Sequence, residues 1–333
     1  MVTLTFPTWM EPYRALATGK VSRDQWQALM RQLLWPVLGI GLFLLMWQFA
    51  AQRIDTSLGQ FPGPAQVWEQ AGNLVNEHQQ AREREVAFHE RQEKYIAARL
   101  EQQPDWQPVT RAYTGAPTFF DQIGTSLITV MSGFLLASMI AIPLGIVIGL
   151  SSTVHAAVNP LVQLFKPVSP LAWLPLVTMV VSALYVSDDP MVSKSFLTSM
   201  FTVTLCCLWP TLMNTAVGVT SVSQDLTNVS RVLRLNALSH VRKIVLPSAL
   251  PMMFTGLRLS LGIAWMVLIA AEMLAQNPGL GKFVWDEFQN GSSQSLGRIM
   301  VAVIVIGLIG FLLDRLMLML QRALVWDKSS VQR

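Results

Sequence analysis

Two charged residues, Arg258 and Glu272, stand inside an apolar stretch that runs from Pro251 to Ala275. A charge at the centre of a bilayer costs about 2.5–3.5 kcal/mol on insertion scales, so such side chains usually face a cavity or a partner. Fourteen residues separate the two, roughly 21 Å along a helix, which rules out a direct ion pair. Arg258 could instead pair with Asp314, snorkel to the interface, or stand beside a pathway as an electrostatic waypoint for an anion.

The pathway hypothesis also includes Trp265, which lies between the two charges. Glu272 is close to the end of the stretch, where we expect exposure at the membrane interface. Its charge would repel an anion, so we do not expect this carboxylate to bind an anionic substrate directly. We therefore expect Arg258, Trp265 and Glu272 to border a translocation pathway, with Arg258 acting on the anion.

Other residues that could do chemistry do not gather in the sequence. Cys206 and Cys207 are neighbours in a predicted helix and point in different directions, which favours neither a disulfide nor a metal pair. His155 and His240 stand alone in predicted loops, so no metal or acid–base centre is expected near the bilayer. We predict no catalytic residue and no metal site, and a membrane-embedded enzyme is disfavoured.

The composition is that of an integral membrane protein. Of the 333 residues, 52% are hydrophobic and only 13% are charged, whereas soluble domains have about 25% charged residues. The apolar residues form long uncharged runs, and a spanning helix needs roughly 20 of them. Six transmembrane helices are predicted, at 33–51, 123–150, 171–187, 195–217, 251–275 and 299–320.

These spans divide the chain into predicted parts. The parts are a cytoplasmic N-terminal segment 1–32, the first span 33–51, an external insertion 52–122, a core of five spans 123–320 with a cytoplasmic loop 218–250, and a cytoplasmic tail 321–333. The Lys and Arg residues of the short loops concentrate on the side that holds the N-terminus, which predicts that both termini are cytoplasmic. The first span follows a long leader and exceeds the usual apolar run of a signal peptide, so we interpret it as an uncleaved anchor.

The insertion 52–122 differs in composition from the rest of the chain. Its stretch "EHQQAREREVAFHERQEKYIAARLE" is rich in good helix formers of both charges, which predicts a solvated helix outside the membrane. His78 and His89 lie three helical turns apart and could hold a metal ion. A solvated helix that stiffens the loop is the favoured interpretation, and contact with an external partner is the alternative.

Small residues and prolines mark sites of close packing or of irregular backbone. Gly145 and Gly149, like Gly256 and Ser260, are spaced as in membrane helices that approach closely. The segment "PVSPLAWLPLV", residues 167–177, either kinks the start of a helix or exposes carbonyls that shape a pathway.

The loop before the fifth span has the pattern of a helical hairpin. In "NVSRVLRLNALSHVRKIVLP", residues 228–247, apolar residues recur at three- and four-residue spacings, which is typical of short amphipathic helices. Asn236 and Ser239 mark a break between two of them, and Pro247 and Pro251 are expected to end the second helix before the membrane. Such a hairpin is suited to docking into a groove on another protein, or to lying on lipid headgroups.

This loop resembles the "EAA" motif of binding-protein-dependent ABC transporter permeases. The continuation "SALPMMFTGLRLSLGIAWMVLIAAEML…NPGLGKFVWDEFQ" is similar to the nitrate, bicarbonate and cyanate branch, which also includes taurine and alkanesulfonate permeases; nitrate permeases are the most similar. The resemblance covers residues 120–333 and is strongest over 209–287. It implies an all-α, six-helix membrane protein with the type I ABC importer permease fold, in the bacterial inner membrane.

The resemblance also implies which residues contact the ATPase. They are Asn228, Val229, Ser230, Arg231, Arg234, Leu235, Val245 and Pro247. The chain departs from the motif at several of these positions, because Asn228 replaces an acidic residue and Arg234 replaces the turn glycine. Arginine does not enter a left-handed turn as readily as glycine, so we expect the turn to be made differently or the ATPase contact to be altered.

The implied partners are ABC ATPase subunits, an external solute-binding protein, a second permease copy, most simply as a homodimer, and membrane lipid. No nucleic-acid partner is expected. The stretch "PGLGKF" lacks the spacing of an ATP-binding loop, because Gln276 and Phe283 replace the required Gly and Ser or Thr. We therefore expect no cofactor and no enzymatic site in this chain, with ATP bound by separate subunits.

Two alternatives to a nitrate permease remain: one has the same architecture but another cargo, and the other is a different class of transport protein. Within the same architecture, the cargo could be taurine, an alkanesulfonate, bicarbonate or cyanate instead of nitrate. A self-contained secondary transporter or channel is the other possibility, and it would need coupling-ion ligands in mid-membrane or symmetric repeats. Neither feature is visible in the sequence.

Overall fold

The computed structural model describes residues 23–56, 59–103, 105–186, 192–292 and 294–324. The chain divides into two compact units, residues 1–69 and 70–333. In the first unit, α2 (Arg23–Ala51) is followed by a short antiparallel pair, β1 (Asp55–Thr56) and β2 (Gly59–Gln60), and by the start of α3 (Pro64–Gln102). The indole N–H of Trp47 donates to the Pro62 carbonyl over 3.1 Å, and so ties α2 to the segment after β2.

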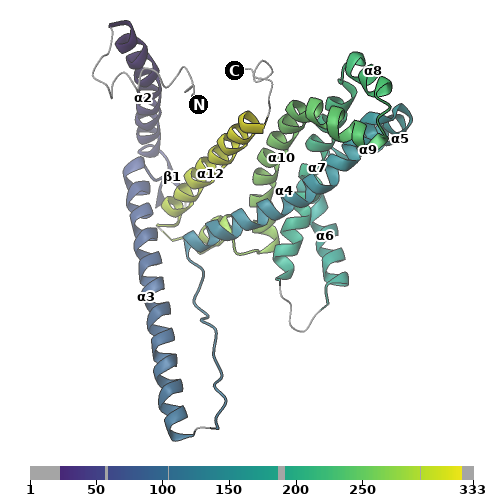
Figure 1. Cartoon of the computed structure of the whole chain (residues 1–333). Coiled ribbons are helices and arrows are strands. Elements are labelled where there is room, and N and C mark those ends of the chain that lie inside the picture. The colour runs from purple at the N-terminus through teal and green to yellow at the C-terminus, as the bar shows by residue number, and fades with distance from the viewer. Residues whose placement is uncertain (1–22, 57–58, 104, 187–191, 293, 325–333) are drawn as a thin grey trace. The chain divides into compact units, whose positions relative to one another are not determined.

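The second unit is built from helices (Figure 1). After the rest of α3, they are α4 (Phe119–Leu150), α5 (Ser152–Phe165), α6 (Pro170–Leu184), α7 (Lys194–Thr220), α8 (Gln224–Val232), α9 (Ala237–His240), the π-helical turn η2 (Val241–Val245), α10 (Leu246–Ala275), α11 (Leu280–Asn290) and α12 (Ser295–Leu324). The predicted all-α class is confirmed, and the two short strands lie in the first unit.

Five described helical segments are long and apolar enough to cross a membrane. They lie at Leu34–Ala51, Phe119–Leu150, Lys194–Thr220, Ala237–Ala275 and Ser295–Leu324, and include five of the six predicted spans. The remaining prediction, 171–187, corresponds to α6, which has only 15 residues. At a rise of 1.5 Å per residue it extends roughly 22 Å, less than the ~30 Å hydrocarbon core.

α6 and α5 pass the same test together as a bent pair, which gives a sixth span if the pair counts as one, and the two axes differ in direction by 99°. The predicted loop around His155 is helical, because Ser151 caps α5 by accepting a hydrogen bond from the Val154 N–H. The break falls at Pro167, and Ser169 then caps α6 with Pro170 in its first turn. Of the two interpretations of the proline-rich segment, the structure supports a kink at the start of a helix.

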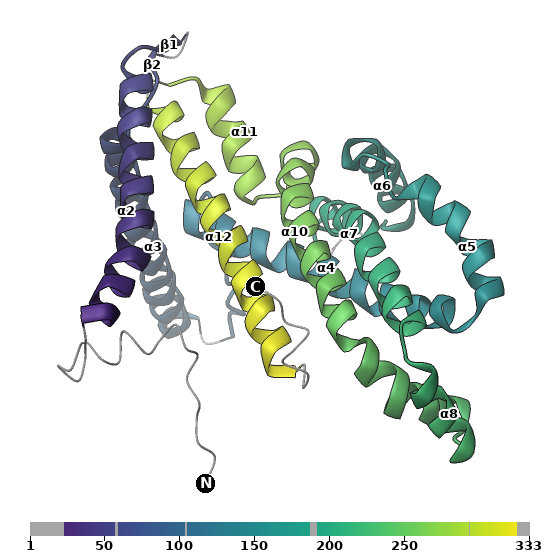
Figure 2. The same cartoon turned by 90° about the horizontal axis from the view of Figure 1, so that it is seen from above.

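The core of the second unit forms where α7 packs against both α4 and α10 (Figure 2). Glycines let the backbones approach: a Cβ at Gly145 would lie 2.7 Å from the Leu212 carbonyl oxygen on α7. A Cβ at Gly256 would lie 2.9 Å from the Pro210 carbonyl oxygen on the same helix. Both predicted small-residue pairs therefore sit at close helix crossings.

Ser260 completes the crossing of α7 and α10 by entering the hydrogen-bond ladder of α7. The Thr211 N–H donates to the Ser260 hydroxyl oxygen over 3.1 Å, and that hydroxyl donates to the Cys207 carbonyl over 2.5 Å. A buried polar group in an apolar bundle must find a partner inside the protein, and the Ser260 hydroxyl finds both a donor and an acceptor on α7.

Candidate functional site

The predicted hairpin is present as α8 and α9, at the end of α10 (Figure 2). Asn236 caps α9 by accepting from the Ser239 N–H over 2.8 Å. The His240 ring nitrogen Nδ1 and the Ser230 hydroxyl lie 2.8 Å apart and join the two short helices. Ser230 and Val245 are buried, so these two predicted contact residues hold the hairpin together and seat it on the core.

The turn of the hairpin is made at Arg234 in the left-handed conformation, with φ of 47°. The Leu235 N–H donates to the Ser230 carbonyl and the Arg234 N–H donates to the Arg231 carbonyl. This pair of bonds is the Schellman motif, in which glycine usually occupies the left-handed position. Of the two expected consequences of Arg234, a different turn is not found, because the two bonds hold arginine in a conformation that costs roughly 1–2 kcal/mol. An altered ATPase contact stays a prediction.

Apolar side chains project from the hairpin into open space. Val232 and Leu238 are 81% and 78% exposed, on either side of the turn. The predicted contact residues Asn228, Val229, Arg231 and Arg234 are exposed with them, and Leu235 is half-buried. The hairpin therefore exposes a surface that is both apolar and basic.

The second helix of the hairpin, which begins with α9, does not end before the predicted membrane span. Helical structure is continuous from Ala237 to Ala275, through η2 and α10. The Leu246 N–H bonds to the Val241 carbonyl, five residues back, which is the π-helical pattern. The prediction that Pro247 and Pro251 stop the helix was wrong, because a wider turn just before Pro247 accommodates the ring and its missing N–H.

Arg258 pairs with Asp314 of α12, which is one of the three alternatives considered for it. Both Arg258 Nε and Nη2 donate to the carboxylate, the second over 2.9 Å. The two side chains remain 41% and 38% exposed. A charged pair that is partly open in an apolar bundle must face water or another protein surface, because hydrocarbon would leave it unsatisfied.

Trp265 is buried between α10 and α12. Its indole N–H donates to the Ile306 carbonyl over 2.9 Å, and its ring lies against Gly310. Within this chain Trp265 therefore fixes the spacing of α10 and α12, and its side chain is almost completely covered. Its place on a pathway stays a prediction.

Glu272 is fully buried, with 0% exposure, so the expected interfacial exposure was wrong. The Ser126 hydroxyl of α4 lies 2.8 and 2.9 Å from its two oxygens, and the Gly281 N–H donates to it over 3.0 Å. Ser126 in turn accepts from the Leu280 N–H over 2.8 Å. The carboxylate satisfies backbone groups at the start of α11, and this geometry gives no support to a pathway role for Glu272.

The loop between α10 and α11 is shaped around this carboxylate. Gln276 ends α10 in the left-handed conformation with φ of 56°. A Cβ on Gly279 would collide with the Glu272 carboxylate, and one on Gly281 would collide with the Ile269 carbonyl. Asn277 is buried and donates to Thr129 of α4 over 3.3 Å. We call Glu272, Ser126, Gly279 and Gly281 the carboxylate–glycine lock.

Sequence reasoning missed this lock because it assigned Glu272 by its position along the span. The signal was the run "NPGLGK" shortly after the carboxylate, since two glycines at a helix start favour close approach of another group. Ser126 and Ser260 carried no signal, because their partners lie far away in sequence.

A metal site at His78 and His89 finds no support in the geometry. Among the described residues no three metal-ligating side chains gather, and the His78 ring nitrogen Nδ1 lies 2.7 Å from the Thr118 hydroxyl.

Comparison with known proteins places this arrangement among transport proteins. The sequence profile described as binding-protein-dependent transport system inner membrane component matches residues 141–326. The fold and the match define a membrane subunit of a transporter. More particularly, the chain belongs to the family of binding-protein-dependent inner membrane components, the permeases of ABC transporters.

Two relatives and one structure illustrate the match. The nitrate import permease protein NrtB of Leptolyngbya laminosa is 37% identical over 220 residues, covering 65% of this chain and 74% of the relative. The bicarbonate transport system permease protein CmpB of Synechococcus elongatus is 32% identical over 299 residues, covering 90% and 91%. An inward-facing structure of the MetNI methionine ABC transporter matches with a TM-score of 0.53 at 13% identity, covering 62% of this chain and 95% of that one, and supports the fold.

The carboxylate–glycine lock predicts the effect of two substitutions, one that removes the carboxylate and one that displaces it. Glu272→Ala should leave the Gly281 N–H and the Ser126 hydroxyl without their buried partner and open a cavity, lowering the free energy of unfolding by about 3 kcal/mol. Gly279→Ala should act similarly by displacing the carboxylate. Hydrogen exchange of a peptide over 276–290 should speed up in both variants.

The exposed Glu90→Ala serves as the control and should exchange like the unmodified protein. If the 276–290 peptide exchanged at the unmodified rate in both lock variants, the lock would not hold the start of α11.

Proposed function

We propose that this chain is the permease subunit of an ATP-driven importer for a small anion, with nitrate as the first candidate. Support comes from the family and from relatives named for nitrate and for bicarbonate import. The single observation that carries the mechanism is the continuous helix from Ala237 to Ala275, which joins the exposed hairpin to Arg258. Bicarbonate is the second candidate, since the CmpB relative matches over more of the chain.

Coupling to ATP would pass through the hairpin. Separate ATPase subunits would bind the surface around Val232, Leu238 and Arg234, where exposed apolar area and basic charge lie together. Burial of apolar side chains contributes about 25 cal/mol per Å², so this surface offers more than an electrostatic contact. Because the second limb is continuous with α10, movement of the hairpin would move Ser260 and Arg258 with it.

The charged pair would belong to the pathway. Two permease copies, most simply identical ones, would enclose one conduit, with an external solute-binding protein delivering cargo and both chain termini in the cytoplasm. Arg258 is held by Asp314 in a defined position, so a passing anion meets a positive group whose orientation is already fixed. The Asp314 charge keeps the local net charge low, which would prevent tight trapping of the anion.

The hairpin assignment predicts that Val232→Ser combined with Leu238→Ser abolishes co-purification with the ATPase subunits. Anion-stimulated ATP hydrolysis and uptake should then fall at least ~10-fold, since about 1.4 kcal/mol of lost binding corresponds to a factor of ten. Nitrate, bicarbonate, cyanate and a sulfonate are compared as stimulating cargo in the intact complex. Val86→Ser, an exposed apolar residue on α3, is the control.

Retention of the ATPase and of normal uptake in the double hairpin variant would contradict the coupling surface. Transport by the purified chain alone would contradict the importer assignment as a whole and favour a secondary transporter or channel.

A charge exchange separates a pathway role of Arg258 from a structural one. Arg258→Gln alone should reduce anion uptake at least ~10-fold, about 1.4 kcal/mol, because the waypoint is lost. Arg258→Asp combined with Asp314→Arg restores an ion pair but moves the positive group onto α12. Assembly and thermal stability should recover in the exchanged variant, whereas uptake should stay low. Full recovery of uptake would show that the pair only joins the helices.

A further inference from the structure

The distal part of α3 is held out from the bundle by polar contacts near its base. Arg82 pairs with Asp121 over 2.7 Å, and His78 lies 2.7 Å from Thr118 at the N-terminal cap of α4. Arg298 of α12 pairs with Glu77 of α3. Beyond Arg82, α3 continues for five more turns to Gln102, and residues 105–118 return beside it (Figure 1).

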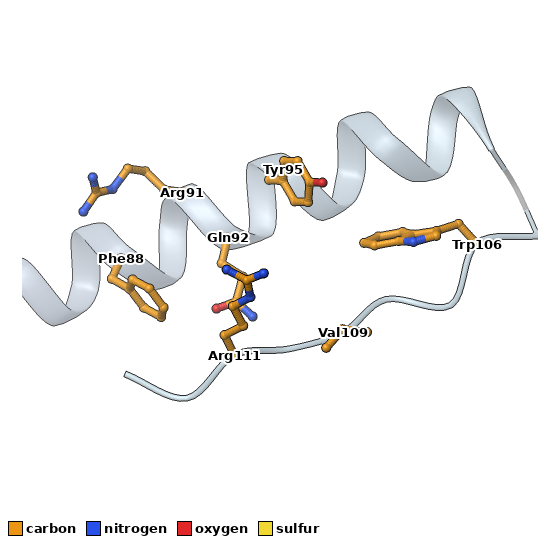
Figure 3. Close-up of a pocket in the computed structure, with 7 residues that line it drawn as sticks. All are labelled: Phe88, Arg91, Gln92, Tyr95, Trp106, Val109 and Arg111. Atoms are coloured by element: carbon orange, nitrogen blue, oxygen red, sulfur yellow. The ribbon is translucent and has the colours of Figure 1, made fainter. Parts of the chain in front are cut away.

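A groove of about 650 Å³ lies between distal α3 and the returning segment (Figure 3). Its apolar lining comes from both sides, with Phe88 and Tyr95 on the helix and Trp106 and Val109 on the return. The rings of Tyr95 and Trp106 meet edge to face at 6.2 Å. In the orientation that pairs donors with acceptors, the Gln92 amide bonds both the N–H and the C=O of Arg111, over 2.7 and 3.0 Å.

The charges on this groove all have one sign. Among the described residues, the charged side chains that line it are Arg91 and Arg111, and none is a carboxylate. In the described part of the chain neither guanidinium forms an ion pair, although Arg91 Nε donates to the Ala87 carbonyl. Aromatic residues and arginine, with Lys, Asp and Glu depleted, are the composition of the core of a protein–protein interface.

We propose that this groove docks the external solute-binding protein of the transporter through a short acidic segment of that protein. The uncompensated guanidinium groups select an anionic partner, and the small size of the groove fits a weak, reversible contact. A two-fold contact between copies would bring the same cationic groove against itself, which disfavours a second permease copy as the occupant. This inference rests on the proposed function, because that function places α3 outside the membrane.

The test uses the complete complex of permease and ATPase in nanodiscs, titrated with the cargo-loaded solute-binding protein. The groove variant is Arg91→Glu combined with Arg111→Glu. The control, Arg84→Glu combined with Lys94→Glu, reverses the same amount of charge on exposed α3 residues outside the groove lining. The groove variant should need at least tenfold more binding protein for half-maximal ATPase stimulation, with an unchanged maximal rate.

Trp106→Ala should shift the half-maximal concentration in the same direction without any change of charge. Equal titration curves for the groove variant and the control would overturn the docking site while leaving the proposed function intact. No stimulation of the unmodified complex would overturn the proposed function and the docking site together. A change in the number of permease copies per complex in the groove variant would instead assign the groove to contact between copies.

Discussion

A π-helical turn over Val241–Val245, closed by the hydrogen bond from the Leu246 N–H to the Val241 carbonyl, keeps the exposed hairpin and the bundle on a single helix. Without the π turn that this bond closes, Pro247 would interrupt the ladder at the point where the chain enters the bundle. With it, Ala237 to Ala275 is a continuous element, and a displacement at one end is a displacement of the whole. The energetic coupling proposed for this protein depends on that continuity.

Polar contacts of three side chains then fix the long helix to four neighbours, α7, α12, α4 and α11. Ser260 enters the ladder of α7, Arg258 pairs with Asp314 of α12, and Glu272 bonds Ser126 of α4 and the start of α11. Each contact satisfies groups that would be costly to leave unpaired in an apolar bundle. Movement of the helix must therefore carry these neighbours with it or exchange these partners, and either outcome links the hairpin to the far end of the bundle.

Composition and apolar run length were sufficient to predict the helical class and most of the spans, because membrane burial leaves a direct trace in hydropathy. The close pairs around Gly145 and Gly256 were also visible as spacings. The failures have a common physical origin. Arg234 adopts the left-handed turn, and Pro247 stays within a helix, because nearby hydrogen bonds override the local preference of one residue type. Glu272 is buried because its partners lie on α4 and α11. The position of Glu272 near the end of its own span does not indicate these partners.

The continuity of the helix from hairpin to lock is best tested by a distance measured along it in different states of the complex. Spin labels would be placed through Leu238→Cys and Leu274→Cys, both exposed, after Cys206 and Cys207 are replaced. A continuous helix sets the separation of these positions at roughly 54 Å. In complexes assembled with an excess of unlabelled permease, so that each complex carries at most one labelled copy, pulsed dipolar spectroscopy should give one distance distribution that is the same in the nucleotide-free and ATP-trapped states. A second, shorter population in either state would show that the helix breaks near Pro247 and would contradict the account.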